Sequence, residues 1–286
     1  MRYISADIGG FKAFGAAMDI IKAFKESGFT AYDASMCDGA LDDILFAENW
    51  EEKAKELRAY ADGLGIVCNQ SHAPFASARK GDEEYNRQMF PKLVRAIQVS
   101  GILGVKVCVV HPCNDWTAEE NAEYIYKPLE PYARAAGVKI GVENMWNGEW
   151  RENGFTALPA ACSHHGDFKK HLDLLPADIF VACLDIGHAE MRGLDTSAVQ
   201  MIETLAERLE ALHIHDVDKT FDNHQIPFTH NIDFEAVIQA LKKAEYKGDI
   251  TLEACAFSEK APKGIQRAAI QYSAAVAEYF RARLDD

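Results

Sequence analysis

Short apolar runs alternate along this chain with longer stretches in which apolar positions recur every three or four residues. The short runs indicate buried strands, and the longer stretches indicate amphipathic helices. The predicted strands are residues 3–8, 30–35, 66–70, 105–110, 138–142, 180–184, 209–214 and 249–252. The predicted helices are residues 16–27, 50–64, 82–100, 118–136, 168–175, 196–208, 233–245 and 267–283, several of them followed at once by a glycine that can cap the last turn.

This strict alternation predicts one α/β domain over residues 1–286, a single (β/α)8 TIM barrel. No Pro/Gly/Ser-rich linker or low-complexity tract interrupts the pattern. A doubly wound open sheet would produce a similar periodicity. The barrel is favoured because the chain fits its usual length and because Gly9-Gly10-Phe11, after the first strand, is not a dinucleotide-binding fingerprint.

Composition narrows the classes of partner. The formal net charge of −14 disfavours nucleic acid over most of the surface, although bound metal ions can reverse the local charge. No apolar stretch reaches the roughly 18–20 residues of a membrane span, and the N-terminus starts a strand rather than a signal peptide, so a cytoplasmic protein is expected. The 7 cysteines lack paired spacing and mostly lie inside apolar runs, Cys255 among them, which indicates reduced thiols; Cys113 is a weaker ligand candidate.

Metal-type ligands stand at the ends of the predicted strands. A lone buried histidine is more often a core residue than a ligand, but in a parallel barrel all strand ends meet at one mouth. Four consecutive strands end at Glu143, Asp185, His213 and Glu253. Three carboxylates and one imidazole suit one divalent ion, Mn²⁺, Co²⁺, Mg²⁺ or Zn²⁺.

With these residues in place, the chain resembles the xylose isomerase-like TIM barrel superfamily over nearly its whole length. Its members include tagatose and psicose 3-epimerases, hydroxypyruvate isomerase, inosose dehydratase and endonuclease IV. In the epimerase branch the resemblance implies that Glu143, Asp185, His213 and Glu253 hold one metal. It implies that Glu143 and Glu253 are also catalytic, and that His188 contacts a substrate oxygen. His213 is chosen over its neighbour His215 because the family pattern is a ligand histidine, an apolar residue, a polar residue and an aspartate.

The resemblance to endonuclease IV extends to further positions. That enzyme binds three zinc ions, and its additional ligands correspond here to His72, His111, His188, Asp222 and His224. A second or third metal, with Asp222 and His224 as the additional ligands, is therefore left open. Sugar-active relatives also carry histidines at the third and fourth strand ends, so the match does not establish a trinuclear site.

Four residues are assigned to substrate binding: His72, His111, Trp146 and Arg192. The segment after Glu143 is bulky and aromatic where endonuclease IV is glycine-rich, so Trp146 and Trp150 are interpreted either as a wall for a sugar ring or as packing anchors. Basic residues after the strands, Arg79-Lys80, Arg151, Arg192 and Lys219, are candidates for binding phosphate, but each is more easily explained as a surface charge. An unphosphorylated sugar is therefore preferred.

The leading hypothesis is a metal-dependent isomerase or epimerase of a sugar or keto sugar. A metal bridging the carbonyl and hydroxyl oxygens would stabilise an enediolate, while one glutamate removes a proton and the other returns it. Three alternatives stay open: a sugar or inositol dehydratase that uses the same enediolate, an endonuclease IV-like zinc phosphodiesterase, and a non-catalytic sugar-binding barrel. The resemblance also allows for a homo-oligomer.

Overall fold

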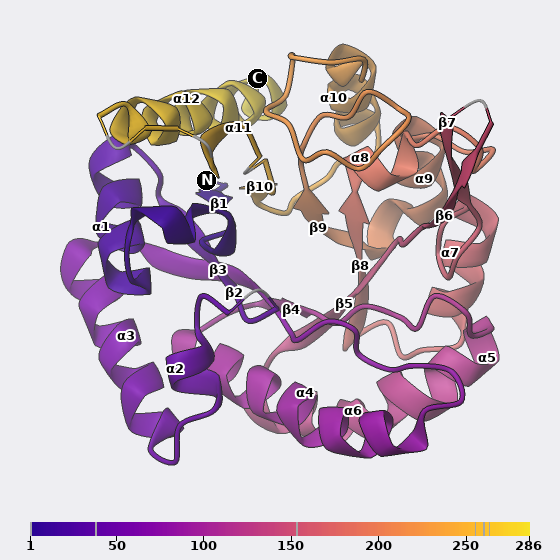
Figure 1. Ribbon diagram of the computed structural model, residues 1–286, viewed down its shortest axis with the longest axis horizontal. Helices are drawn as coiled ribbons and strands as arrows, with labels where there is room; N and C mark the ends of the chain where they lie inside the picture. The colour runs from indigo at the N-terminus through magenta and orange to yellow at the C-terminus, as the bar shows by residue number, and fades with distance from the viewer. Residues whose placement is uncertain (1, 38, 153, 255, 260, 263) are drawn as a thin grey trace.

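The computed structural model describes residues 2–37, 39–152, 154–254, 256–259, 261–262 and 264–286. The parallel strands lie at the centre and helices surround them (Figure 1). The strands are β1 (Ile4–Ala6), β2 (Ala31–Ser35), β3 (Val67–His72), β4 (Val107–Val109), β5 (Lys139–Glu143), β6 (Asn147–Arg151), β7 (Gly154–Leu158), β8 (Phe180–Asp185), β9 (Leu209–His213) and β10 (Ile250–Leu252). The helices are η1 (Gly9–Phe14), α1 (Ala17–Ser27), α2 (Asp42–Leu45), α3 (Trp50–Leu64), α4 (Glu83–Leu103), α5 (Ala118–Asn121), η2 (Ala122–Tyr126), α6 (Lys127–Ala136), α7 (His165–Asp173), α8 (Ile186–Ala189), α9 (Ala198–Leu205), η3 (Ala206–Arg208), α10 (Phe234–Lys243), α11 (Ala256–Glu259) and α12 (Gln266–Asp285).

The main sheet is parallel and has 6 strands, in the order β2-β3-β4-β5-β8-β9. The first and last strands of the chain, β1 and β10, pair with each other in parallel, Ile4 opposite Ile250. Isolated parallel bridges, Asp7 with Asp33 and Ile214 with Leu252, link this pair to the two edges of the main sheet. The predicted parallel α/β architecture is confirmed.

Two apolar layers hold the strands in place. The larger one lies between strands and helices and contains residues such as Tyr126, Phe168 and Phe280. A smaller cluster lies inside the curved sheet and consists of Val107, Val109, Val181, Cys183 and Ala211. Strands buried on both faces require continuous apolar runs, which is why β4 and β8 contain few polar residues before their ends.

Several predicted helix boundaries differ from the observed ones, and the end of α4 is the most informative case. We expect the helix of residues 82–100 to end at Gly101, but α4 continues to Leu103 and Gly104 caps it with φ +80°. Gly101 is needed for packing instead, since a Cβ atom there would lie 2.9 Å from the carbonyl oxygen of Ala136 on α6. A glycine inside a helix therefore marks a close approach between two helices.

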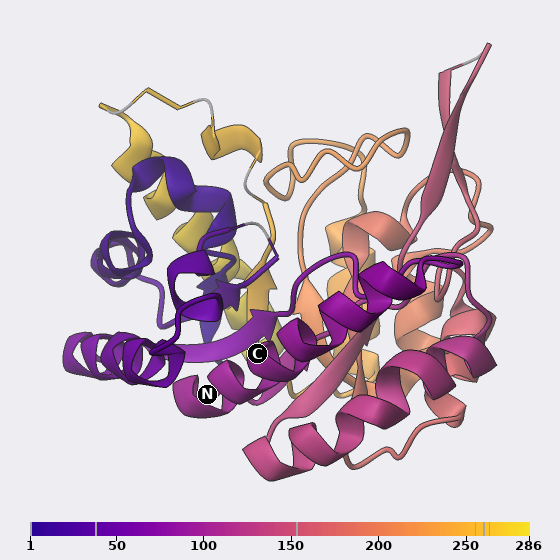
Figure 2. The ribbon, with the colours of Figure 1, turned by 60° about the horizontal axis from the view of Figure 1, so that its bottom comes forward.

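A hairpin follows β5 where a loop was expected. β6 and β7 pair antiparallel, with Trp150 opposite Phe155 and their rings 5.5 Å apart. The hairpin extends away from the body of the molecule, on the side where the segment after β9 lies (Figure 2). Cross-strand aromatic pairs of this kind stabilise a two-stranded ribbon.

Two compositional predictions can be compared with the described residues. Cys68, Cys108, Cys113, Cys162 and Cys183 are free thiols, while Cys255 lies outside the described residues. None of the described helices is both long and apolar enough to span a bilayer.

Candidate metal centre

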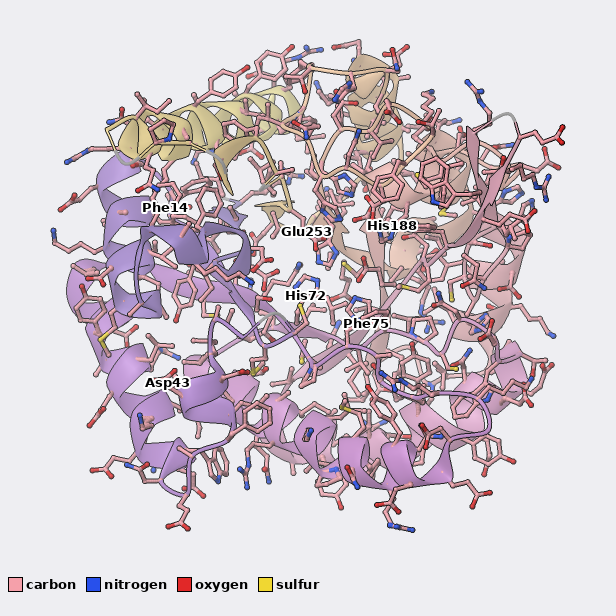
Figure 3. All side chains as sticks on the ribbon, viewed as in Figure 1. Phe14, Asp43, His72, Phe75, His188 and Glu253 are labelled. Carbon is pink, nitrogen blue, oxygen red and sulfur yellow. The ribbon has the colours of Figure 1, made fainter. Side chains whose placement is uncertain are left out.

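The ligand-type side chains lie where the parallel strands end. Glu143, Asp185 and His213 are the last residues of β5, β8 and β9, and Glu253 follows β10. The β8–β9 register places Asp185 directly opposite His213. In Figure 3, His72, His188 and Glu253 all lie inside the ring of helices, near one another although they come from distant parts of the chain.

The four predicted metal ligands form one group, which we call the central cluster. One ligand atom from each of Glu143, Asp185, His213 and Glu253 lies within 4.8 Å of the others. His213 Nδ1 is 3.0 Å from Glu143 Oε1 and 3.2 Å from Glu253 Oε2. Glu253 keeps 19% of its side chain exposed, whereas Glu143 keeps 1%. The cluster therefore has a buried side and a side that reaches solvent.

A second group shares Glu143, and we call it the β3–β4 cluster. His111 Nε2 lies 3.0 Å from Glu143 Oε2, and His72 Nε2 lies 4.0 Å from the same oxygen. The His72 ring stacks on that of His213 with centroids 4.2 Å apart. Asp33, at 3.3 Å from His72 Nδ1, supports the other side of the His72 ring.

A third group, the outer cluster, consists of His188, His215, Asp222 and His224, whose ligand atoms also lie within 4.8 Å of one another. His188 Nε2 and His224 Nε2 are 3.0 Å and 3.1 Å from Asp222 Oδ2. His215 Nε2 is 3.0 Å from both oxygens of Asp185, so this residue connects the outer cluster with the central one.

The clusters have a charge pattern that suits cations. Burial raises the pKa of Glu143, but the nearby imidazoles of His213 and His111 outweigh this and hold it well below its usual range. Burial lowers the pKa of His224, but the Asp222 carboxylate raises it to about 10. The surroundings thus favour the negative charge of Glu143 and a proton on His224, and a divalent cation would take the place of such a proton.

Several buried polar atoms in these clusters have no hydrogen-bond partner. They include His72 Nε2, His111 Nδ1, His215 Nδ1 and Asp222 Oδ1. Buried polar groups are normally paired, and unpaired oxygen and nitrogen atoms that lie together can serve as ligands of a cation. The residues present therefore fit a divalent metal.

The predicted substrate-binding residues Trp146 and Arg192 lie in different surroundings. Trp146 lies beside the outer cluster: its indole N–H donates to Asp222 Oδ2 at 3.3 Å, and its ring packs edge-on against Phe155 and Phe221. Trp150 is 78% exposed. Arg192 is exposed, and its backbone N–H donates to the Lys219 carbonyl.

Sequence reasoning passed over residues that the structure brings to the clusters. His215 was set aside as a polar neighbour, yet it is completely buried between Asp185 and Asp222. Asp33 ends no predicted ligand motif but supports His72. The signal that could have identified His215 is its spacing: residues i and i+2 of an extended segment share one side, so His213 and His215 can both face the mouth.

The chain belongs to the xylose isomerase-like TIM barrel family, whose sequence profile matches residues 21–276. Among curated relatives, the uncharacterised protein y4fM of Sinorhizobium fredii is 24% identical over 68% of this chain and 64% of its own length. The uncharacterised protein MJ1311 of Methanocaldococcus jannaschii is 27% identical over 64% of this chain and 62% of its own length. The chain thus spans less than two thirds of these relatives.

Solved structures share the fold over nearly their whole lengths. A D-tagatose 3-epimerase-like protein superposes with a TM-score of 0.75 at 19% identity, covering 99% of this chain and 98% of that one. D-psicose 3-epimerase from Clostridium cellulolyticum H10 gives 0.72 at 16% identity, covering 99% of each chain. The IOLI protein with a bound zinc atom gives 0.72 at 14% identity, covering 99% and 98%.

Proposed function

We propose that this protein is a divalent-metal-dependent isomerase or 3-epimerase of an unphosphorylated sugar or keto sugar. The observation that carries the proposal is the central cluster, in which Glu143 and Glu253 approach the same nitrogen of His213 at 3.0 Å and 3.2 Å. Two carboxylates beside one metal position can serve as a base and an acid in turn. The names of the structural neighbours, several of them sugar 3-epimerases, support this choice.

We also propose that the strands close into one (β/α)8 barrel. The bridges Asp7–Asp33 and Ile214–Leu252 support closure, because each lies between an edge strand of the main sheet and a strand of the β1–β10 pair. A closed ring would keep every strand end at one mouth, which is where this fold places its active sites.

The proposed reaction begins with removal of a proton from a carbon next to a carbonyl. Glu143, Asp185, His213 and Glu253 would hold the metal, which when bound supplies positive charge where negative charge develops on the substrate oxygens. One glutamate removes the proton and the other returns it to the opposite face. Glu253 reaches solvent and can exchange its proton, whereas buried Glu143 is confined between His111 and His213.

The assignment of His188 to a substrate oxygen stays a prediction that this proposal does not use. Its Nδ1 atom is 2.8 Å from the Asn144 carbonyl, and its Nε2 atom is 3.0 Å from Asp222. Both ring nitrogens therefore already have protein partners.

The basic residues considered for a phosphate group are mostly engaged elsewhere. Lys219 pairs with Glu190 at 2.9 Å, Lys80 lies 3.4 Å from Glu120, and Arg151 pairs with Glu149. Cations already neutralised by carboxylates bind an additional phosphate less strongly. This supports an unphosphorylated substrate.

Deuterium exchange tests the proposal. Metal-loaded protein is incubated in D₂O with a panel of ketopentoses and ketohexoses, and deuterium at the carbons beside the carbonyl is followed by NMR. We expect exchange together with a change of configuration or of carbonyl position, and neither in Glu143→Gln or Glu253→Gln. No exchange with any ketose, although the metal is bound, would overturn it. Loss of a β-hydroxyl as water would instead identify the dehydratase alternative.

A second candidate is a zinc phosphodiesterase of the endonuclease IV type. The specific observation in its favour is the presence of three adjoining clusters, two of which share Glu143. The net charge of −14 opposes it, because phosphodiester substrates are polyanions. Cleavage of an abasic-site duplex by zinc-loaded protein, lost in Asp222→Ala, would establish this activity.

A further inference from the structure

The outer cluster has two histidines whose tautomers are set by the backbone. His188 Nδ1 lies 2.8 Å from the Asn144 carbonyl oxygen, and His224 Nδ1 lies 2.8 Å from the Glu253 carbonyl oxygen. A carbonyl oxygen only accepts, so each Nδ1 carries the hydrogen. Each Nε2 atom then faces the Asp222 carboxylate, as metal-ligating imidazoles do when their other nitrogen is fixed by a backbone carbonyl.

His215 lies against the same carboxylate from a different element. It is fully buried just beyond β9, its ring stacks on His224 at 4.1 Å, and its Nε2 atom is 3.7 Å from Asp222 Oδ1. That oxygen is buried without a hydrogen-bond partner. Asp222 thus has one oxygen that faces His188 and His224 and a second, without a hydrogen-bond partner, that faces His215.

We propose that His215 completes the outer cluster as a fourth ligand, making it a closed, zinc-preferring structural site. Three imidazoles and one carboxylate favour zinc over Mg²⁺ or Mn²⁺, whereas the carboxylate-rich central cluster has no such preference. A tetrahedral zinc site separates its ligand atoms by about 3.3 Å, given metal–ligand bonds of about 2.0 Å. The Nε2 atoms of His188 and His224 lie 3.0 Å and 3.1 Å from Asp222 Oδ2, close to that value. His215 Nε2 lies 3.7 Å from Asp222 Oδ1 and 3.0 Å from Asp185, so its ring would turn away from Asp185 to bind the same ion.

A metal here would fasten the long segment between β9 and α10 to the ends of β8 and β9. Residues 214–233 contain no helix and no strand. The base of the segment is tied by Asp216, whose carboxylate accepts backbone N–H groups of Thr229, His230 and Ile232. Its middle carries Asp222 and His224. The outer metal would join this middle part to His188 on α8 and to His215.

A closed site also has a functional consequence. Structural zinc sites use four protein ligands, and catalytic ones leave a position for water or substrate. With His215 in place, the outer metal would take no part in the chemistry. The inference does not depend on the sugar reaction, because it concerns coordination and loop order only.

His215→Asn separates this role from the alternative, in which Nε2–H of His215 simply donates to Asp185 at 3.0 Å. Asparagine keeps a donor but lacks an imidazole nitrogen. The matched control is His230→Asn, an exposed histidine of the same segment. For each full-length protein, zinc per chain is measured by elemental analysis, the zinc Kd by competition with a chelator, and cleavage within residues 216–232 by limited proteolysis.

We expect His215→Asn to weaken the binding of one zinc ion at least tenfold, to leave the other metal bound, and to speed cleavage of the segment, while His230→Asn matches the wild type. Unchanged zinc affinity in His215→Asn, or loss of the central metal alone, would overturn the proposal. A measurement on the wild type avoids any folding defect: Co²⁺ in the outer site should give the intense visible absorption of tetrahedral coordination. Only the weak absorption of six-coordinate Co²⁺ would also overturn it.

Discussion

The Nε2 atom of His213 lies 3.4 Å from the Sγ atom of Cys183, inside the curved sheet. Burial raises the pKa of Cys183 well above its usual range, so the sulfur keeps its proton. The other ring nitrogen of His213 faces Glu143 and Glu253. Behind the ring of His213, the proposed ligand, a cysteine thus takes the position that a carboxylate or a carbonyl group more often takes behind a metal-binding histidine.

Replacing this cysteine should weaken the central metal site. We expect Cys183→Ala to raise the metal Kd about tenfold, the lower end of the effect of removing such a supporting contact. Cys162→Ala is the control, since Cys162 is equally buried and belongs to none of the three clusters. Equal affinities in the two variants, measured by chelator competition, would show that Cys183 does not position His213.

Glu143 belongs to two clusters, so we expect that removing its negative charge impairs both metal binding and turnover, even when its shape is kept. Glu143→Gln is expected to lower turnover by at least about 10²-fold, as for loss of a general acid or base, and to lower central metal occupancy. Glu123→Gln, which replaces an exposed glutamate paired with Lys127, should retain both. Turnover at the wild-type rate in the Glu143→Gln variant would remove Glu143 from the proposed chemistry.

Removing metal should destabilise the fold. A ligand at about 1,000 times its Kd stabilises by about 4 kcal/mol, which corresponds to a Tm shift of about 8 °C for a chain of this size. Chelated protein should therefore melt several degrees lower in a thermal unfolding scan, and stoichiometric metal should restore the Tm. An identical Tm with and without metal would indicate that none is bound.

The two tryptophans after β5 should behave differently. Trp146 packs against Phe155 and Phe221 and donates to Asp222, so Trp146→Ala should cost about 2 kcal/mol, less than a fully buried ring costs. Trp150 is 78% exposed, and Trp150→Ala should lie within about 0.5 kcal/mol of the wild type. Denaturant unfolding distinguishes them. An equal loss in both variants would contradict the assignment of Trp146 as the packing anchor.

Gly187 should tolerate no side chain. A Cβ atom there would lie 2.0 Å from Cε1 of His215, inside the buried region between β8 and β9. Gly187→Ala should displace that ring and cost about 1–3 kcal/mol, as overpacking does. Gly137→Ala provides a contrast, because no atom lies within 4 Å of the added Cβ and its cost comes from a φ of +67° alone. Retention of outer-site zinc in Gly187→Ala would show that the ring need not stay in place.

The sequence was informative where a ligand-type residue stands at the end of an apolar run. Apolar runs that end in Glu143, Asp185 and His213 predicted both the strands and the side on which their ends meet. Gly101 misled because a glycine can end a helix or permit close packing, and only the neighbouring Ala136 decides between these roles. His215 was passed over because the ligand role was given to His213 alone, and only the structure shows the His215 ring between Asp185 and Asp222.

The pairing of β1 with β10 sets a limit on when the molecule can be completed during its synthesis. Ile4 can pair with Ile250 only after β10 has been synthesised. Glu253, which follows β10, can join the central cluster only after that strand has left the ribosome. At roughly 5–20 residues per second, β1 spends about 10 to 50 s without its final partner. Until then the proposed ligand set lacks Glu253, so tight metal binding would come only after nearly the whole chain has been made.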